Sequence, residues 1–335
     1  MNLPQRISLL TRLGEYLLAN GPGWQEAKQR AEQQNAWFTE TFIDYAVTHM
    51  ARHWLTRATL EQWAASEQIP DQPTAPKTVA VVMAGNIPLV GFHDWLSIFI
   101  SGHRALVKLS SKDAILLPHL FEQLLLWEPA CQPYVQTADR LNGADAYIAT
   151  GSNNSSRYFS YYFGKYPHII RKNRTAVALL SGQETMAELE ALADDVHLYF
   201  GMGCRNVSKL YVPTGYDFIP LLDAFKKYTP LSEHHKYKNN YDYQLALLIL
   251  NKKFYMTNGT LLLTEEESLF APLGQLHYEF YDQPSQALRI ALAHPDLQCL
   301  VGSEGLPFGS SQHPAIEDYA DGVNTLDFLN KKMLN

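Results

Sequence analysis

The hydrophobic positions of the first part of the chain repeat with the period of an α-helix. Within 5–65, apolar residues recur at spacings of three and four, for example at Ile7, Leu10 and Leu13. This spacing places them on one helical face, so we predict an N-terminal helical layer. The segment 69–77 contains three prolines, which remove backbone donors and favour extended backbone. We interpret it as a surface connector to a new unit.

From residue 78 the pattern changes to short apolar runs that alternate with helical stretches. The runs are rich in small and β-branched residues, as in strands buried on both faces of a parallel sheet. The predicted strands are 78–86, 105–111, 145–152 and 175–182, and the predicted helices between them are 90–101, 114–126 and 155–163. This alternation predicts βαβ units and an α/β, doubly wound sheet.

A second α/β segment follows. Its predicted helices are 185–198, 216–228 and 287–293, and its strand-like pieces are 208–213, 245–250, 259–263, 276–281 and 299–303. The stretch 234–244 is dense in Tyr, Asn, Lys and His. It could line a substrate entrance or a partner face, or it could be a solvated helix or loop with aromatic anchors.

Composition narrows the classes of protein. The chain has 335 residues, 46% of them apolar, and 27 Lys+Arg against 34 Asp+Glu give a net charge of −7. This length predicts two domains, and the acidic balance argues against nucleic-acid binding. The apolar runs are far shorter than the roughly 18–20 residues that span a bilayer. No secretory signal is visible, and three cysteines fit a reducing compartment, so we expect a cytoplasmic protein.

Three predicted strands end in polar or glycine-containing turns. The first ends in Gly85-Asn86-Ile87-Pro88, the second in Lys108-Leu109-Ser110-Ser111, and the third in the run 151–156 with sequence GSNNSS. Ligands of open parallel sheets bind at the carboxyl ends of the strands. A glycine-serine turn before a helix can cradle a phosphate. Each turn alone could be an ordinary loop, but together they favour a nucleotide site.

Cys204 is the candidate nucleophile. It follows Gly201 and Gly203 in a flexible loop that leads into a predicted strand. Such a cysteine can act as a nucleophile when nearby donors stabilise its thiolate, although a lone cysteine is more often a small buried hydrophobe. Cys131 and Cys299 lack glycine-rich surroundings. None of the three has zinc-ligand spacing, so we expect no metal site.

These motifs together resemble a known family. The order Gly-Asn-x-Pro, Val-Lys-x-Ser-Ser, Thr-Gly-Ser and Gly-x-Gly-Cys is similar to that of the aldehyde dehydrogenase superfamily. More narrowly, it resembles the acyl-CoA reductases typified by the fatty-acid reductase subunit of bacterial luminescence. The C-terminal motifs Phe308-Gly309-Ser310, His313-Pro314, DYADGVNT (318–325) and Phe328-Leu329 resemble the same branch. The resemblance extends over 78–329.

The resemblance implies a reaction and a set of roles. Cys204 would attack a thioester carbonyl, with the Asn86 amide and the Cys204 N–H as the oxyanion hole. A reduced nicotinamide cofactor would then deliver hydride and release an aldehyde. The implied cofactor-binding residues are Lys108 and Ser110 at the adenosine ribose, Gly151 and Ser152 near the pyrophosphate, and Ser111 and Glu267.

Three departures from the superfamily pattern matter. Leu179 stands where oxidising members carry the glutamate that activates water, so an acyl-enzyme should await a thiol or a hydride. Ser111 replaces an acid that repels a 2′-phosphate, so we expect NADPH, with NADH as the alternative. Ser268 stands in place of the acid that grips the nicotinamide ribose, and Glu267 would need a shift of one residue.

The resulting expectation is an aldehyde-dehydrogenase-like α/β fold. A Rossmann-type cofactor domain with N-terminal helices would cover 1–195, a smaller catalytic domain 196–312, and a tail packing back on the junction 313–335. The expected substrate is an acyl-CoA, fatty acyl above all, or another acyl thioester. An acyl-transfer partner protein and a homo-oligomer stay open. The alternatives are a reductase of another activated acid, such as an acyl phosphate, and a catalytically silent nucleotide-binding scaffold.

Overall fold

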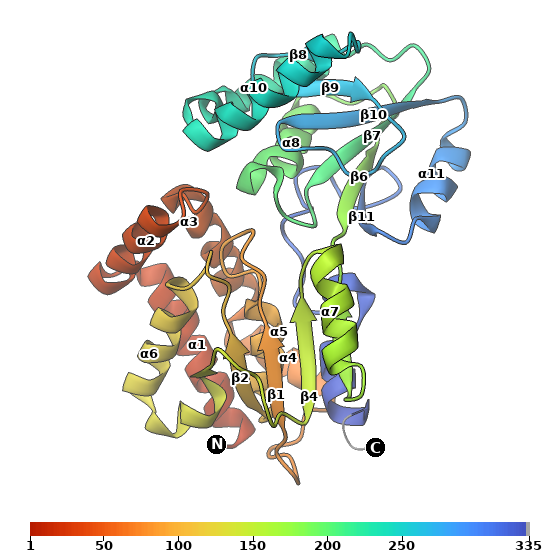
Figure 1. Ribbon diagram of the computed structural model, residues 1–335. Coiled ribbons are helices and arrows are strands. Elements are labelled where there is room, and N and C mark those ends of the chain that lie inside the picture. The colour runs from red at the N-terminus through yellow and green to blue at the C-terminus, as the bar shows by residue number, and fades with distance from the viewer. Residues whose placement is uncertain (333–335) are drawn as a thin grey trace. The chain divides into compact units, whose positions relative to one another are not determined.

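The computed structural model describes residues 1–332 and divides the chain into two units. The first unit comprises Met1–Asn173 together with the chain from Ala315 onward, and the second is the continuous segment Arg174–Pro314. Each unit has its own sheet (Figure 1). Both units are α/β, as predicted.

The N-terminal layer of the first unit is helical, as predicted. It consists of α1 (Leu3–Ala19), α2 (Pro22–Gln34), α3 (Glu40–His49), a π-helical turn (Met50–Trp54) and α4 (Arg57–Ser66). Polar side chains begin the helices: Asn2 forms a reciprocal capping box with Gln5, and Thr39 and Thr56 cap α3 and α4. Ile7, Leu10 and Leu13 are buried, which confirms the helical period.

The sheet of the first unit is parallel and has the order β3-β2-β1-β4-β5. Its strands are β1 (Thr78–Val82), β2 (Arg104–Lys108), β3 (Gln136–Thr137), β4 (Ala146–Thr150) and β5 (His168–Arg171). Helices α5 (Phe92–Ser101), α6 (Leu116–Trp127) and α7 (Asn153–Phe163) lie between the strands in sequence. The prediction missed β3 and β5 because both are too short to show a periodic pattern.

The returning C-terminal segment packs within the first unit. It contains two short helical turns, Ala320–Gly322 and Phe328–Lys332, and α12 (Thr325–Asp327). A buried ion pair anchors it: the Arg171 guanidinium contacts Asp94 at 2.7 Å and also donates to the carbonyl of Ala320 and the hydroxyl of Thr325. Segments distant in sequence therefore share one polar network inside the first unit.

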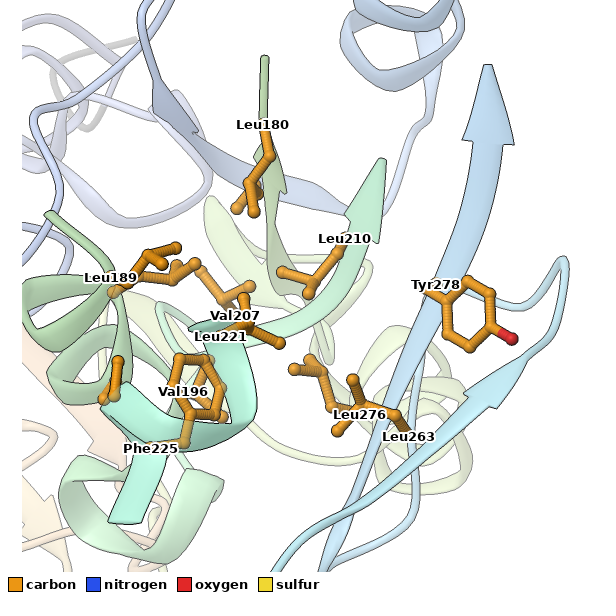
Figure 2. Close-up of a cluster of buried hydrophobic side chains, with 14 of the residues drawn as sticks. Leu180, Leu189, Val196, Val207, Leu210, Leu221, Phe225, Leu263, Leu276 and Tyr278 are labelled. Atoms are coloured by element: carbon orange, nitrogen blue, oxygen red, sulfur yellow. The ribbon is translucent and has the colours of Figure 1, made fainter. Parts of the chain in front are cut away.

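The second unit is built on the sheet β11-β6-β7-β10-β9-β8, parallel except for β8. Its strands are β6 (Thr175–Leu179), β7 (Val207–Pro213), β8 (Met256–Thr257), β9 (Leu262–Glu265), β10 (Gln275–Tyr281) and β11 (Leu297–Gly302). Its helices are α8 (Met186–His197), α9 (Ile219–Ala224), α10 (His235–Leu250) and α11 (Pro284–Ala293), with 3₁₀ turns at Leu198–Gly201 and Phe225–Glu233. Figure 2 shows part of the core, where Val196 and Val207 lie near Leu221 and Phe225.

Two sequence predictions differ from the structure. The boundary between the units lies at Asn173 and Arg174 rather than at 195–196, so β6 and α8 belong to the second unit. All of β6 is buried between β7 and β11, and a buried parallel strand looks the same in sequence whichever sheet it joins. The predicted strand at 245–250 is instead the end of α10.

No helix among residues 1–332 is long and apolar enough to cross a membrane.

Candidate functional site

The polar strand ends of the first unit lie side by side. Val82 of β1 pairs with Lys108 of β2 on one side and with Ala149 of β4 on the other. The turns that follow these three strands therefore share one edge of the sheet. The structure thus brings the segments carrying Asn86, Ser110 and Gly151 to the same edge.

Gly85 and Ser110 approach each other closely at this edge. A Cβ atom on Gly85 would lie 2.5 Å from the Ser110 hydroxyl oxygen, so a larger residue would push the two turns apart. The Ser110 hydroxyl accepts the N–H of Lys112 at 3.2 Å. Lys108, Ser111 and Lys112 are exposed. This edge therefore presents two cations and a serine to solvent, a surface that tolerates an added phosphate.

The Gly151-Ser152 turn begins α7. A Cβ atom on Gly151 would lie 2.8 Å from the Phe159 ring and 2.9 Å from the Cβ of Ser155. The Ser152 hydroxyl accepts the N–H of Ser155 at 3.3 Å and caps the helix. A glycine that allows close approach and a helix N-terminus together suit an anion such as a pyrophosphate. The residues at this edge therefore fit a dinucleotide.

Asp113 holds the loop that carries Asn86, and the sequence analysis did not single it out. Its carboxylate accepts the N–H of Leu89 at 2.8 Å, and Leu89 has a left-handed φ of 55°. The other carboxylate oxygen is buried without a hydrogen-bond partner. Burial raises the pKa of Asp113 to about 6, although the bond from Leu89 opposes the shift. Its one signal in sequence is an acid directly after the polar end of a strand.

Cys204 occupies a tight turn in the second unit. The N–H of Asn206 donates to the carbonyl of Gly203 at 3.1 Å, so Cys204 and Arg205 are the two central residues of this turn. The Cys204 side chain is half-buried. By contrast, Cys131 is buried, and burial raises the pKa of its thiol to about 12. Cys299 is half-buried on β11.

The Phe308-Gly309-Ser310 motif leads into a loop that contacts the Cys204 turn. The buried Asp195 carboxylate accepts the N–H of Gly309 at 2.6 Å and that of Ser311 at 2.9 Å. Arg205 donates to the carbonyl of Ser311 at 3.5 Å. Burial raises the pKa of Asp195, and the two backbone donors oppose that shift. Arg205 therefore joins the turn to this loop.

Leu179, the position at which the superfamily resemblance places a general base, has apolar surroundings. Leu179 is buried on β6 among residues that include Val177, Tyr211 and Leu300. The next acid along the chain, Glu184, accepts hydrogen bonds from its own loop, from the N–H groups of Ser181 and Gly182 and from the Ser181 hydroxyl. Both carboxylate oxygens of Glu184 therefore stabilise the structure of its own loop.

The segment after β9 is held by its backbone. The carbonyl of Glu267 accepts from Lys209 at 2.7 Å, that of Ser268 from His277 at 2.8 Å, and that of Leu269 from Ser208 at 2.5 Å. The side chains of Glu267 and Ser268 are exposed. Lys209 and Ser208 belong to β7, so this segment folds back along the strand that follows the Cys204 turn.

The aromatic stretch 234–244 forms the first part of α10. Tyr237 and Tyr241 are buried, and the Tyr237 hydroxyl donates to the carbonyl of Thr260 at 3.0 Å. The ring of His234 lies 4.5 Å from that of Phe200, which precedes the Cys204 turn. These aromatic residues act as anchors of the helix.

The candidate residues divide between the units. Asn86, Lys108, Ser110, Ser111, Gly151 and Ser152 belong to the first unit, and Cys204 and Glu267 belong to the second. Within residues 1–332, no three His, Cys, Asp or Glu side chains are grouped so that they could hold a metal ion.

Solved structures of similar fold include several aldehyde dehydrogenases. One is an aldehyde dehydrogenase from Mycobacterium tuberculosis complexed with NAD+. The match covers 90% of this chain and 73% of that protein's chain, with a TM-score of 0.65 and 13% sequence identity. A succinic semialdehyde dehydrogenase from Streptococcus pyogenes in complex with NADP+ matches 89% over 76% of its own chain (TM-score 0.63, 16% identity). An NAD-dependent benzaldehyde dehydrogenase from Corynebacterium glutamicum matches 90% over 76% of its own chain (TM-score 0.62, 13% identity).

At these identities the similarity establishes an aldehyde-dehydrogenase-like fold. No family model matches the sequence, and no curated protein matches it.

Proposed function

We propose that this protein reduces an acyl thioester, above all a fatty acyl-CoA, to an aldehyde through an acyl-enzyme on Cys204. The observation that carries the proposal is the tight turn that presents a half-buried Cys204. The apolar surroundings of Leu179 support it, because an acyl-enzyme without a base to activate water is not hydrolysed quickly. A nicotinamide-dependent aldehyde dehydrogenase fold suits this chemistry.

In the proposed reaction the Cys204 thiolate attacks the thioester carbonyl. The Asn86 amide and the Cys204 N–H would stabilise the oxyanion, and its collapse breaks the C–S bond to CoA, whose thiolate takes up a proton. In comparable sites, each such donor lowers the activation barrier by about 3–4 kcal/mol. Collapse of a second tetrahedral species then releases the aldehyde and restores the Cys204 thiolate.

The reduced nicotinamide cofactor would supply the hydride for the second half of the reaction. Lys108 and Ser110 would contact the adenosine ribose, and Gly151 and Ser152 would face the pyrophosphate. Glu267 would reach the nicotinamide ribose. Exposed Ser111, in a turn with two exposed lysines and no exposed acid, supports NADPH over NADH. In this proposal the first unit is the cofactor domain and the second is the catalytic domain.

The proposal is tested by following NADPH absorbance with acyl-CoA of short, medium and long chains, and separately with NADH. We expect turnover that is lost in Cys204→Ala and retained in Cys299→Ala, the matched control in the same unit. Without cofactor, mass spectrometry should detect an acyl group on the Cys204 peptide. An oligomer, or stimulation by an acyl-carrying protein, would be measured in the same preparation.

Two outcomes would contradict the proposal. Absence of turnover at every chain length, with no acyl group on Cys204, would leave a nucleotide-binding scaffold as the better description. Turnover with an acyl phosphate but with no acyl-CoA would move the reaction to another activated acid.

A further inference from the structure

The side chain of Asn206 is saturated with hydrogen bonds beneath the Cys204 turn. It is 2% exposed. Its Oδ1 accepts the N–H of Gly203 at 2.8 Å, and its Nδ2 faces three carbonyl oxygens. These belong to Asp195 (3.0 Å), Val196 (3.3 Å) and Leu198 (2.9 Å). A buried amide with every group satisfied fixes its neighbours strongly, because releasing one leaves an unpaired buried partner.

Two hydrogen bonds between the same two residues close the turn. The Asn206 backbone N–H donates to the Gly203 carbonyl, and the Asn206 side chain accepts the Gly203 N–H. Cys204 and Arg205 lie between these bonds. The backbone that carries the thiol is therefore held at both ends by one residue.

The carbonyls that Asn206 binds stand at the end of α8. The last carbonyls of a helix have no partner within it, so an outside donor is required. The chain then runs through Tyr199, Phe200 and Gly201, three successive left-handed residues with φ of 54°, 57° and 75°. Two of them are aromatic, and a non-glycine residue in this region is strained because its Cβ atom lies close to the following carbonyl oxygen. The hydrogen bonds of Asn206 therefore stabilise the strained segment between α8 and the Cys204 turn.

We propose that Asn206 is the positioning residue for Cys204. It joins the end of α8 to the nucleophile turn and keeps the thiol in one place against the strain of the preceding backbone. The inference rests on the proposed function in that it takes Cys204 as the nucleophile. Its effect on the position of the thiol can nevertheless be measured without any substrate.

Two variants test this role, and two others serve as controls. Asn206→Asp keeps the acceptor for Gly203 but turns an oxygen toward three carbonyl oxygens, and Asn206→Ala removes both functions. Asn258→Asp is the matched control, because Asn258 acts in its own loop as an acceptor for the N–H groups of Thr260 and Leu261. Leu263→Ala lowers the stability of the same unit from the core and has no hydrogen bond to the turn.

The measurements are kcat and KM for acyl-CoA, and the rate of Cys204 alkylation by iodoacetamide as a function of pH. All are made well below the melting temperature of each variant. We expect kcat to fall by up to about 100-fold in both Asn206 variants, since a small misplacement of a reacting group has this effect. KM should change little. The alkylation profile of Cys204 should change while that of Cys299 stays the same.

The controls decide the result. Asn206 variants with wild-type kcat and wild-type alkylation of Cys204 would overturn the proposal, as would an equal loss of kcat in folded Leu263→Ala. If the wild type shows no turnover but the alkylation of Cys204 still depends on Asn206, the positioning role stands and the proposed reaction fails.

Discussion

The Asp113 carboxyl is buried, and it accepts a hydrogen bond from Leu89, a residue with a left-handed backbone conformation. Among residues 1–332, the Leu89 N–H is the one donor to this carboxylate, and its second oxygen has no hydrogen-bond partner. Its pKa is about 6 in the folded protein against 3.8 in the unfolded chain. Each unit of this difference corresponds to about 1.4 kcal/mol, so the ionised group costs on the order of 3 kcal/mol.

This difference predicts the direction of a pH effect. The folded state binds the proton more tightly, so the stabilisation from protonated Asp113 is complete below about pH 4 and is lost by about pH 6. An asparagine at this position would keep an acceptor for the Leu89 N–H and could not ionise. We therefore expect Asp113→Asn to gain roughly 2 kcal/mol relative to the wild type between pH 4 and pH 7. Urea unfolding at both pH values measures this, and an equal difference at both would contradict it.

At this scale the sequence singles out some residues as candidates and gives little sign of others. Cys204 and the strand-end residues stand out because glycine, serine and cysteine are informative in a local motif, and their roles stay predictions. Asn206 and Asp113 could not, because their importance lies in hydrogen bonds to backbone groups, and Asn206 also binds carbonyls of a preceding helix. A sequence does not show which backbone groups the fold leaves in need of a partner.

At the scale of single elements, α7 is the helix whose start matters most for the proposed cofactor site. Only Ser156 of this helix is buried. Phe163 packs its ring 4.3 Å from that of Tyr147 on β4 and holds the helix to the sheet. The start of the helix depends on the small size of Gly151, since Phe159 and Ser155 fill the adjacent space.

Gly151→Ala is therefore predicted to displace the first turn of α7. The added methyl would lie under 3 Å from two side chains, and we expect the dissociation constant of NADPH to rise by at least about tenfold, which is a loss of about 1.4 kcal/mol. Fluorescence titration with NADPH measures it. Gly23→Ala is the control, because its methyl would make only ordinary contacts, with Tyr16 at 3.6 Å and His119 at 3.8 Å. This variant should bind NADPH normally. Unchanged affinity in Gly151→Ala would count against the assigned site.

Elements of regular length and period were the easiest to predict. The helical character of the N-terminal layer and the buried strands β1, β2 and β4 follow from spacing and from β-branched composition, whereas the division of that layer into α1–α4 was not predicted. The helix α10 was partly mistaken for a strand because its final residues form a continuous apolar run, whereas its buried positions Tyr237, Tyr241 and Leu248 are spread along it at helical spacing. Period alone does not separate short apolar strands from helix ends.

At the scale of the whole molecule, the first unit depends on residues from both ends of the chain. Its C-terminal segment buries five large side chains: Ile316, Tyr319, Leu326, Phe328 and Leu329. The Tyr319 hydroxyl also accepts the indole N–H of Trp63 at 2.9 Å and donates to Glu67 at 3.0 Å. Burial of such side chains contributes about 1.5–3 kcal/mol each, comparable in sum to the whole stability of a typical domain.

Truncation after Pro314 is accordingly expected to unfold the first unit. Hydrogen exchange should show loss of protection in β1 and β4, whereas β7 and β10, whose core contains no residue of the C-terminal segment, should keep theirs. Protection of β1 and β4 at the level of the full chain would show that the C-terminal segment adds little. The domain boundary itself was beyond sequence reasoning, because contacts between distant residues define it.

The discontinuity of the first unit has a consequence for the order of events during synthesis. Translation proceeds from the N-terminus, so Arg174–Pro314 is complete while Phe328 and Leu329 have yet to be made. The second unit therefore has all of its residues first, whereas the core of the first unit cannot be completed until Phe328 and Leu329 have been added. During that interval the surface of α5 that receives α12 stays uncovered. A slowly translated C-terminal stretch would lengthen the period in which chaperones or proteases have access to it.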